Sequence, residues 1–389
     1  MKVAIFFALI ALCAGSTLTR SGSFGNIENL VKENNYAYER FEVQTEDGYI
    51  MELYRVFDVQ NRKQQSDKEA VLLFHGYLYN CEEFAMGGDA ESLAFYLVQQ
   101  GYEVYLANAR GTTYGMRHIH LNPKTDAAFW RFSFHDIGTK DLPAIVDKVL
   151  EVSKRSKIHF VAHMEGTSAS YVFLSEKPEY NQKIERLVSL GPMAYMVNSE
   201  QEIINLALRN NKAWYHKNLG ISTFTPSEEI INEVRTKCIN EKYEQRVCEN
   251  VYFLYNGFNS VDYNTTTIER VLSKVPSTGS VRDLLHFVQL KKSGRFERYD
   301  ENFVSKQQGA SGVQEYDLSK ITVPVGVIYT PRDKFAHADD VKFLISKLPK
   351  VFAQRLFDDM YNNMDLIFNK NAEKVNEVVM HFIKGNSVY

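Results

Sequence analysis

The sequence lacks a strong excess of charge and, beyond its first residues, any long hydrophobic run. The formal net charge is -3 over 389 residues, which argues against a surface for nucleic acid or for an anionic membrane. No later stretch is apolar enough to span a bilayer, so no transmembrane segment is expected. Internal repeats and low-complexity tracts are also missing. With 44% hydrophobic residues, we expect a soluble globular protein with a sizeable core.

The N-terminus has the layout of a secretory signal peptide. Lys2 precedes an apolar stretch over Val3–Cys13, and small residues follow at 14–16. The stretch is too short to span a bilayer, and the alternative of a buried N-terminal helix fits the basic start less well. We therefore predict a signal peptide over residues 1–16 and a secreted mature protein.

Cysteine is scarce, and export would place the remaining thiols in an oxidising compartment. Cys238 and Cys248 are close in the sequence and form the predicted disulfide bond, which would leave Cys81 free. The triplet that begins at Asn264 matches a glycosylation sequon, so we expect a glycoprotein.

Apolar runs alternate with segments of helical periodicity along most of the chain. Strands are predicted at 69–76, 102–109, 157–163, 184–192, 321–329 and 351–357. Helices are predicted near 93–97, at 142–150, from 166 onward, at 340–348 and at 375–383. This alternation predicts an α/β fold with a mostly parallel sheet flanked by helices.

The alternation is interrupted by a stretch of polar helical segments without a clear strand. We interpret residues 198–317 as a helical cap that is inserted between two parts of one core. The core would cover residues 17–197 and 318–389. A sheet that resumes after an insertion is one architecture, not two independent domains.

A predicted turn between a strand and a helix gives the strongest functional clue. The stretch HFVAHMEGTSAS covers residues 159–170, and one large group of hydrolases has G-x-S-x-G at its centre, with Ser as the nucleophile. Met164 occupies the position of that Ser. In such hydrolases an Asp and then a His follow along the chain. Asp333 lies just past a predicted strand, whereas the later loop DDMYNNMDLIF, at 358–368, contains no His.

Several long blocks match one known family in the same order. They read FEVQTEDGYIMELYRV, LLFHGYLYN, LANARGTTYG, FWRFSFHDIGTKDLPA, TPRDKFAHADDV and YNNMDLIF. In these blocks the chain resembles the acid lipase family, the group of gastric and lysosomal acid lipases. The resemblance implies an α/β-hydrolase fold with a helical cap over a lipid-binding cleft. It also makes a lysosomal-type compartment an alternative to secretion, and no cofactor is expected.

At the catalytic positions the sequence departs from the family. The family's GHSQG is AHMEG here, which places Met164 at the nucleophile and Asn363 at the His, while Asp333 matches the acid. The resemblance further implies an oxyanion hole made by the backbone N–H groups of Tyr77 and Glu165. A thioether has no proton to lose, and a carboxamide neither accepts nor delivers one near neutral pH. We therefore expect a catalytically inactive protein.

Other residues are alternative sources of the lost groups. Ser168 and Ser170 lie further along the predicted helix, and His337 sits where the family usually has an acid, so none suits a mechanism that needs contacts near 3 Å. His163 flanks the turn and is expected to pack. His118 and His120 have a spacing that a metal site in an extended segment could use, but no further ligand set is evident and no metal is predicted.

The residues around the turn have structural interpretations as well. Gly166 would permit close packing of the helix on the strand. Glu165, in the first helical turn, is expected to be a carboxylate stabilised by the helix dipole. Met164 is expected to fill the floor of the pocket, with contact to the acyl chain of a ligand as the alternative. Trp130 and His135 lie in a block that is expected to be core.

The retained scaffold and the lost Ser and His favour a secreted, catalytically silent relative of the acid lipases. Such a protein would bind a lipid or another hydrophobic ligand, or a protein partner. One alternative is an active carboxylic ester hydrolase of lipid catabolism with an unorthodox nucleophile. The other is a secreted storage or structural protein without a ligand.

Overall fold

The computed structural model describes most of the predicted core and part of the predicted cap. Of the cysteines, Cys81 lies within the described ranges, where it is buried and has a free thiol. The predicted signal peptide, the pair Cys238 and Cys248, and Asn264 lie outside the described residues. The described ranges are 26–59, 68–89, 91–209, 222–223, 265–275, 277–303, 312–357 and 361–387.

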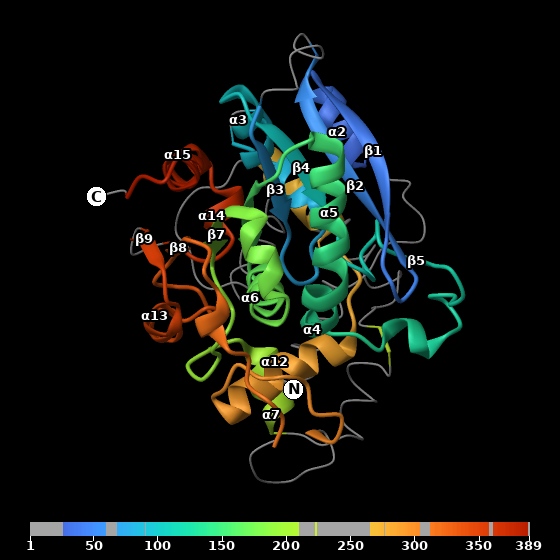
Figure 1. Ribbon diagram of the computed structural model, residues 1–389, viewed down its shortest axis with the longest axis vertical. Coiled ribbons are helices and arrows are strands. Elements are labelled where there is room, and N and C mark those ends of the chain that lie inside the picture. Colours follow the sequence, from blue (N-terminus) through green and yellow to red (C-terminus); the bar gives the residue numbers. More distant parts are fainter. Residues whose placement is uncertain are drawn as a thin grey trace.

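A nine-stranded sheet forms the centre of the molecule (Figure 1). Its order is β1-β2-β4-β3-β6-β7-β8-β9, with β5 paired to β2. Strand β2 pairs antiparallel with β1, β4 and β5, and the other pairs are parallel, which confirms the predicted mostly parallel sheet. The strands are Tyr36–Gln44 (β1), Tyr49–Asp58 (β2), Ala70–Phe74 (β3), Glu103–Ala107 (β4), Arg117–His118 (β5), Ile158–His163 (β6), Ile184–Leu190 (β7), Val325–Tyr329 (β8) and Val351–Leu356 (β9).

The central strands are apolar along their length because both faces of the sheet are covered. Every residue of β3, β4 and β6 is buried, including the runs AVLLF and IHFVAH. The edge strand β1 instead consists of half-buried and exposed residues, with Val43 alone buried. The uninterrupted runs of the sequence therefore mark the middle of the sheet.

Helices cover both faces of the sheet. Helices α5 and α6 lie over one face, and α3 lies over the other, where it contacts α15 (Figure 1). The helices outside the predicted cap are Ile27–Glu33 (α2), Leu93–Gln99 (α3), Phe134–Asp136 (α4), Leu142–Ser153 (α5), Glu165–Glu176 (α6), Ala338–Lys347 (α13), Asp365–Phe368 (α14) and Ala372–Ile383 (α15). Short helical turns span Cys81–Ala85, Ala127–Trp130, Ile137–Asp141, Pro178–Gln182 and Leu318–Lys320.

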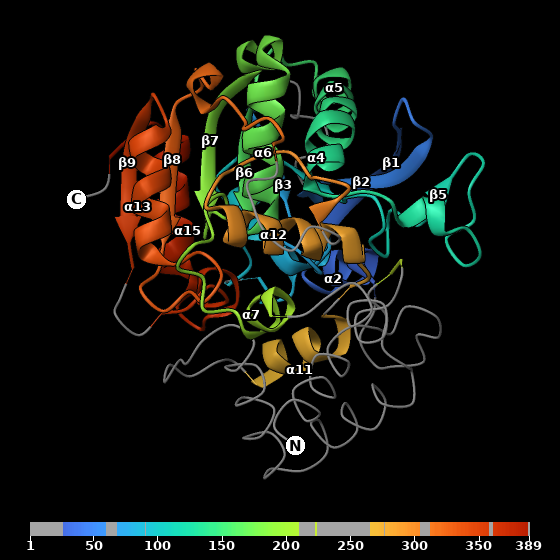
Figure 2. The same ribbon diagram turned by 90° about the horizontal axis from the view of Figure 1, so that it is seen from below.

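The described part of the predicted cap contains helices and no strand of the sheet. Its helices are Glu202–Leu208 (α7), Thr265–Lys274 (α11) and Val281–Ser293 (α12). The Ser280 side chain accepts the Arg282 N–H at the start of α12, and Gly294, with φ 70°, ends the helix. Figures 1 and 2 show α7 and α12 together at one end of the sheet, next to the start of α6.

Candidate active site

The turn between β6 and α6 holds Met164 in a strained backbone conformation. Its φ is 46° and its ψ is -117°, values that cost a non-glycine residue about 1–3 kcal/mol. The Met164 N–H donates to the Leu190 carbonyl at 3.0 Å, and its own carbonyl accepts from the Thr167 N–H at 2.9 Å. The side chain is buried, with 1% of the residue exposed. The turn thus keeps the sharp geometry of a nucleophile elbow around a thioether.

Two glycines bring neighbouring backbone against this turn. A Cβ on Gly166 would lie 2.7 Å from the His75 carbonyl oxygen, which confirms the predicted close packing of α6 on the sheet. A Cβ on Gly76 would lie 2.9 Å from Met164 Cβ and 3.3 Å from its Sδ. The loop that continues into Tyr77 therefore lies directly beside Met164, and the backbones of Tyr77 and Glu165 flank it.

Asp333 and Asn363 meet at the ends of neighbouring strands β8 and β9. Asn363 Nδ2 donates to Asp333 Oδ2 at 2.7 Å, and Asp333 Oδ1 accepts the N–H groups of Phe335 and Ala336 at 2.8 Å each. Burial raises the pKa of Asp333, and these hydrogen bonds oppose that rise. A Cβ on Gly191 would lie 2.3 Å from Asn363 Nδ2, so the contact requires glycine there.

His163 extends the polar chain away from Asn363. Its Nε2 lies 2.8 Å from Asn363 Oδ1, and its Nδ1 lies 3.3 Å from both carboxyl oxygens of Glu83. Glu83 also accepts the Gly76 N–H at 3.3 Å. The side chains of His163 and Glu83 are fully buried. Sequence reasoning expected His163 only to pack, because nothing along the chain connects residues 83, 163 and 363.

The donors and acceptors of this chain determine where its hydrogens lie. Asn363 turns its amide nitrogen toward the acceptor Asp333, so its carbonyl oxygen faces His163. His163 Nε2 faces this oxygen at 2.8 Å, and Nδ1 faces the carboxyl group of Glu83 at 3.3 Å. Both ring nitrogens of His163 are thus engaged inside this buried chain.

The alternative nucleophiles and bases are engaged elsewhere. Ser168 Oγ donates to the Met193 carbonyl, and Ser170 Oγ donates to the Thr167 carbonyl at 2.7 Å. His337 caps α13, where its Nδ1 accepts the Asp339 N–H at 3.3 Å. None of these contacts involves Met164 or Asn363.

Helix α12 lies over the turn and contacts both proposed oxyanion positions. The Tyr77 hydroxyl donates to the Ser280 carbonyl at 3.3 Å, and Ser280 Oγ donates to the Trp130 carbonyl at 2.7 Å. Asp283 accepts the Phe134 N–H at 2.8 Å. Trp130 is buried as expected.

Glu165 differs from the expectation of a charged carboxylate stabilised by the helix dipole. The residue is only 5% exposed, and its carboxyl group faces Asp283 of α12. Burial, followed by the neighbouring Asp283, raises the pKa of Glu165 well above its ordinary value. The helix dipole is outweighed because water, which would solvate a carboxylate, is displaced by α12.

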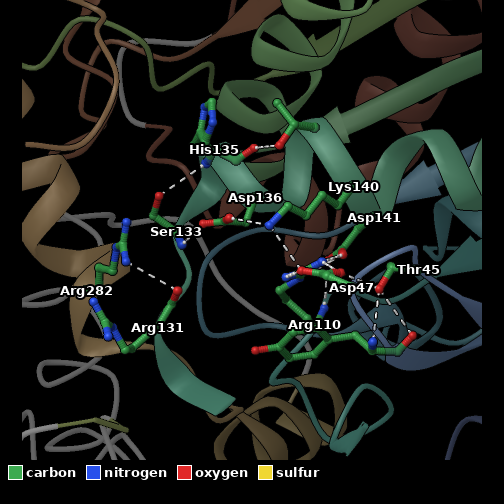
Figure 3. A network of polar contacts seen from close by, with 12 residues as sticks. Thr45, Asp47, Arg110, Arg131, Ser133, His135, Asp136, Lys140, Asp141 and Arg282 are labelled. Carbon is green, nitrogen blue, oxygen red and sulfur yellow. Dashed lines mark hydrogen bonds and ion pairs between the residues drawn. The ribbon is translucent and has the colours of Figure 1, made fainter. Parts of the chain in front are cut away.

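A network centred on Arg110 supports the loop behind the site (Figure 3). Its guanidinium donates to both carboxyl oxygens of Asp47 at 2.8 and 2.9 Å, and its Nε donates to Asp141 at 2.8 Å. The Ala109 N–H donates to His75 Nε2 at 3.0 Å, which ties this loop to the end of β3. Arg110 was not predicted as a structural centre, since its partners are distant in the sequence.

The two imidazoles near β5 do not form a metal site. His118 Nε2 donates to the Asp47 carbonyl at 2.8 Å, and its Nδ1 accepts the N–H groups of His120 and Leu121 at 3.0 Å. Both ring nitrogens of His118 are thus occupied. Within the described ranges, no group of three or more His, Cys, Asp or Glu residues is placed to hold a metal. In the same ranges no helix combines the length and apolar character that crossing a membrane requires.

Comparisons with known proteins agree with this geometry. A family model described as alpha/beta hydrolase fold matches residues 69–368, and one described as partial alpha/beta-hydrolase lipase region matches residues 27–88. The chain is 30% identical to the gastric triacylglycerol lipase of Mus musculus over 362 residues, which cover 91% of this chain and 90% of that protein. It is 31% identical to Lipase 1 of Drosophila melanogaster over 354 residues, covering 90% and 77%.

A solved structure is similar in fold. The crystal structure of a putative lipase from Sulfolobus solfataricus matches with a TM-score of 0.59 at 15% sequence identity, covering 90% of this chain and 95% of that chain. At this identity the likeness concerns the fold alone.

Proposed function

The chain belongs to the α/β-hydrolase fold family and, within it, to the acid lipase group, and from this premise we propose that it is a secreted, catalytically silent lipase relative that binds a lipid or another hydrophobic ligand. Its nucleophile, acid and His positions would be Met164, Asp333 and Asn363. The observation that carries the proposal is the bridge from Asp333 through Asn363 to His163, in which a carboxamide holds the position of the catalytic His.

The chemistry of acyl transfer supports inactivity. A serine attacks because a His accepts its proton, and the group of nucleophile, base and acid acts as a unit. Loss of the nucleophile or the base lowers turnover by about a millionfold. Here Met164 has no proton to give, and Asn363 cannot take one near neutral pH.

Ancestry and composition support a hydrophobic ligand. The gastric triacylglycerol lipase of Mus musculus is named for a lipid substrate, and its similarity covers 91% of this chain. We include in the proposal a signal peptide over residues 1–16, a cap over 198–317, a disulfide bond between Cys238 and Cys248, and glycosylation at Asn264. A lysosomal-type compartment is the alternative location.

An activity assay tests the silent site. The purified parent and the double variant Met164→Ser with Asn363→His are compared on a triglyceride, on a short-chain ester and with a fluorophosphonate probe. We expect no turnover and no labelling of the parent, and at most weak activity of the double variant, because His163 loses its contact with Asn363. Clear labelling of the parent, or ester turnover that Asp333→Ala abolishes, would instead establish the active hydrolase.

Solvent extraction tests the ligand. Lipid that co-purifies with the parent and is identified by mass spectrometry is the expected result. A chain that carries no lipid and takes none up from added fatty acid or triglyceride would favour the storage or structural alternative.

A further inference from the structure

Two acidic side chains from distant parts of the chain meet beside the turn. Glu165 begins α6, next to Met164, and Asp283 lies in the first turn of α12. The residues are 5% and 2% exposed, and their carboxyl groups lie within side-chain hydrogen-bonding reach of each other. An ionised carboxylate only accepts hydrogen bonds, so such a contact requires a proton on one of the two groups.

The surroundings assign this proton to Glu165. Asp283 Oδ1 accepts the Phe134 N–H at 2.8 Å, which favours the ionised form of Asp283. In contrast, Glu165 Oε1 is buried and has no hydrogen-bond partner among the described atoms. A charge on Glu165 would therefore be poorly solvated, and its neutral form donates to Asp283.

Arg282 is the cation that acts on the pair, and its charge favours the ionised form of Asp283. Arg282 donates to the Arg131 carbonyl at 3.3 Å, as Figure 3 shows, and pairs with Glu301 at 2.7 Å. His286 is neutral, with its pKa lowered to about 3 by burial. The remaining neighbours that act on the pair or on His286 are His135, Asp136 and Asp141.

We propose that Glu165 and Asp283 form a latch held by a proton, which docks α12 on the turn between β6 and α6. When the pair releases that proton to water, two like charges remain in a contact that excludes water, and α12 loosens. No ligand and no catalytic step takes part, so the latch is independent of the proposed function. An interface held by ordinary ion pairs would loosen on acidification, whereas this one tightens.

The direction of the pH dependence follows from linkage. Burial raises the pKa of Asp283 to about 6 and raises that of Glu165 well above its usual value. The folded state then binds more protons than the unfolded state, whose carboxyls titrate near about pH 4. The stabilisation is complete below that value and is lost as the pH rises through the folded-state pKa values. Each proton taken up on folding changes the unfolding constant by about tenfold per pH unit.

Urea unfolding between about pH 5 and about pH 8 tests the latch. Glu165→Gln keeps a donor to Asp283 without a titrating proton, so we expect a flatter pH slope and a higher stability than the parent at alkaline pH. Asp283→Asn should flatten the slope as well. Glu151→Gln removes an exposed acid of α5 and should keep the parent slope. Other buried carboxyl groups also have raised pKa values and add to the slope of the parent, namely those of Asp141, Asp333 and Asp340. The test therefore compares the pH slope of each variant with that of the parent.

Two further measurements use the parent alone. Hydrogen exchange of α12 amides, corrected for the intrinsic rate, should rise with pH more than that of α5 amides. Infrared spectra at neutral pH should show a protonated buried carboxyl, which Glu165→Gln removes. Equal pH slopes in the parent and Glu165→Gln overturn the proposal. If Glu165→Gln does not fold, the parent alone still decides. The absence of the protonated carboxyl band, or an equal pH dependence of exchange in α12 and α5, then overturns the proposal.

Discussion

Asn363 connects two buried ionisable side chains through the two ends of one carboxamide. Its Nδ2 donates to Asp333, and its Oδ1 accepts from His163. An amide has a donor end and an acceptor end on one rigid plane, so it can contact a carboxyl group and an imidazole at the same time. The side chain of Asn363 thus links two buried groups that come from different parts of the chain.

Replacement of Asn363 by leucine should be costly. Asn363→Leu leaves Asp333 and His163 each without one hydrogen bond in a fully buried place, and we expect a loss of about 3 kcal/mol in the free energy of unfolding. Asn386→Leu, at an exposed position, should change that free energy by less than about 0.5 kcal/mol. Urea denaturation of both variants measures the difference. Similar small losses would show that the bridge contributes little.

Helix α6 packs on β3 at the distance that a glycine allows. Phe74 and His75 present backbone carbonyls to Gly166, at 2.8 and 2.7 Å from the Cβ that an alanine would have. This close approach fixes the start of α6 and hence the strained turn at Met164. The position of α6 thus depends on the absence of a Cβ atom at residue 166.

Gly166→Ala should therefore destabilise the protein although alanine favours helices. The added Cβ meets rigid backbone, and we expect a loss of about 1–3 kcal/mol. Ser346→Ala, on the exposed side of α13, is the matched small change in a helix and should be neutral within about 0.5 kcal/mol. Thermal unfolding of the two variants tests the contrast, and a Gly166→Ala protein as stable as the parent would contradict it.

At the scale of the whole molecule, buried charge joins the predicted cap to the core. Lys274 at the end of α11 pairs with Glu82 at 2.8 Å, and their side chains are 2% and 0% exposed. Arg270 of the same helix donates to the Met86 carbonyl at 3.3 Å. These contacts belong to α11, whereas Asp283 belongs to α12.

Lys274→Met should loosen this attachment. Removing the ammonium leaves the carboxylate of Glu82 buried without that cation, which costs about 3–5 kcal/mol. We expect faster cleavage by a protease under native conditions and a lower free energy of unfolding. Lys342→Met breaks an exposed pair with Asp339 and should cost less than about 1 kcal/mol. If both lysine variants behave alike, the buried pair does not hold the cap.

Local patterns predicted most elements, whereas contacts between loops could not be predicted. Strand β3 and helix α15 follow from an apolar run and from residues at helical spacing. The antiparallel β1 and β2 were covered only by the family resemblance, because β1 is mostly half-buried or exposed and β2 mixes buried with half-buried residues. The raised pKa of Glu165 could not be predicted, since it depends on burial and on Asp283, which is 118 positions later in the chain.

The sequence by itself determined the fold and the identity of the side chains at the proposed catalytic positions. A thioether at 164 and a carboxamide at 363 exclude ordinary proton transfer whatever surrounds them. Only the tertiary structure decided what these positions do instead: Asn363 bridges Asp333 and His163, and Glu165 meets Asp283. The physical reason is that hydrophobic periodicity is a property of neighbours along the chain. Protonation states and hydrogen bonds depend instead on which distant groups burial brings together.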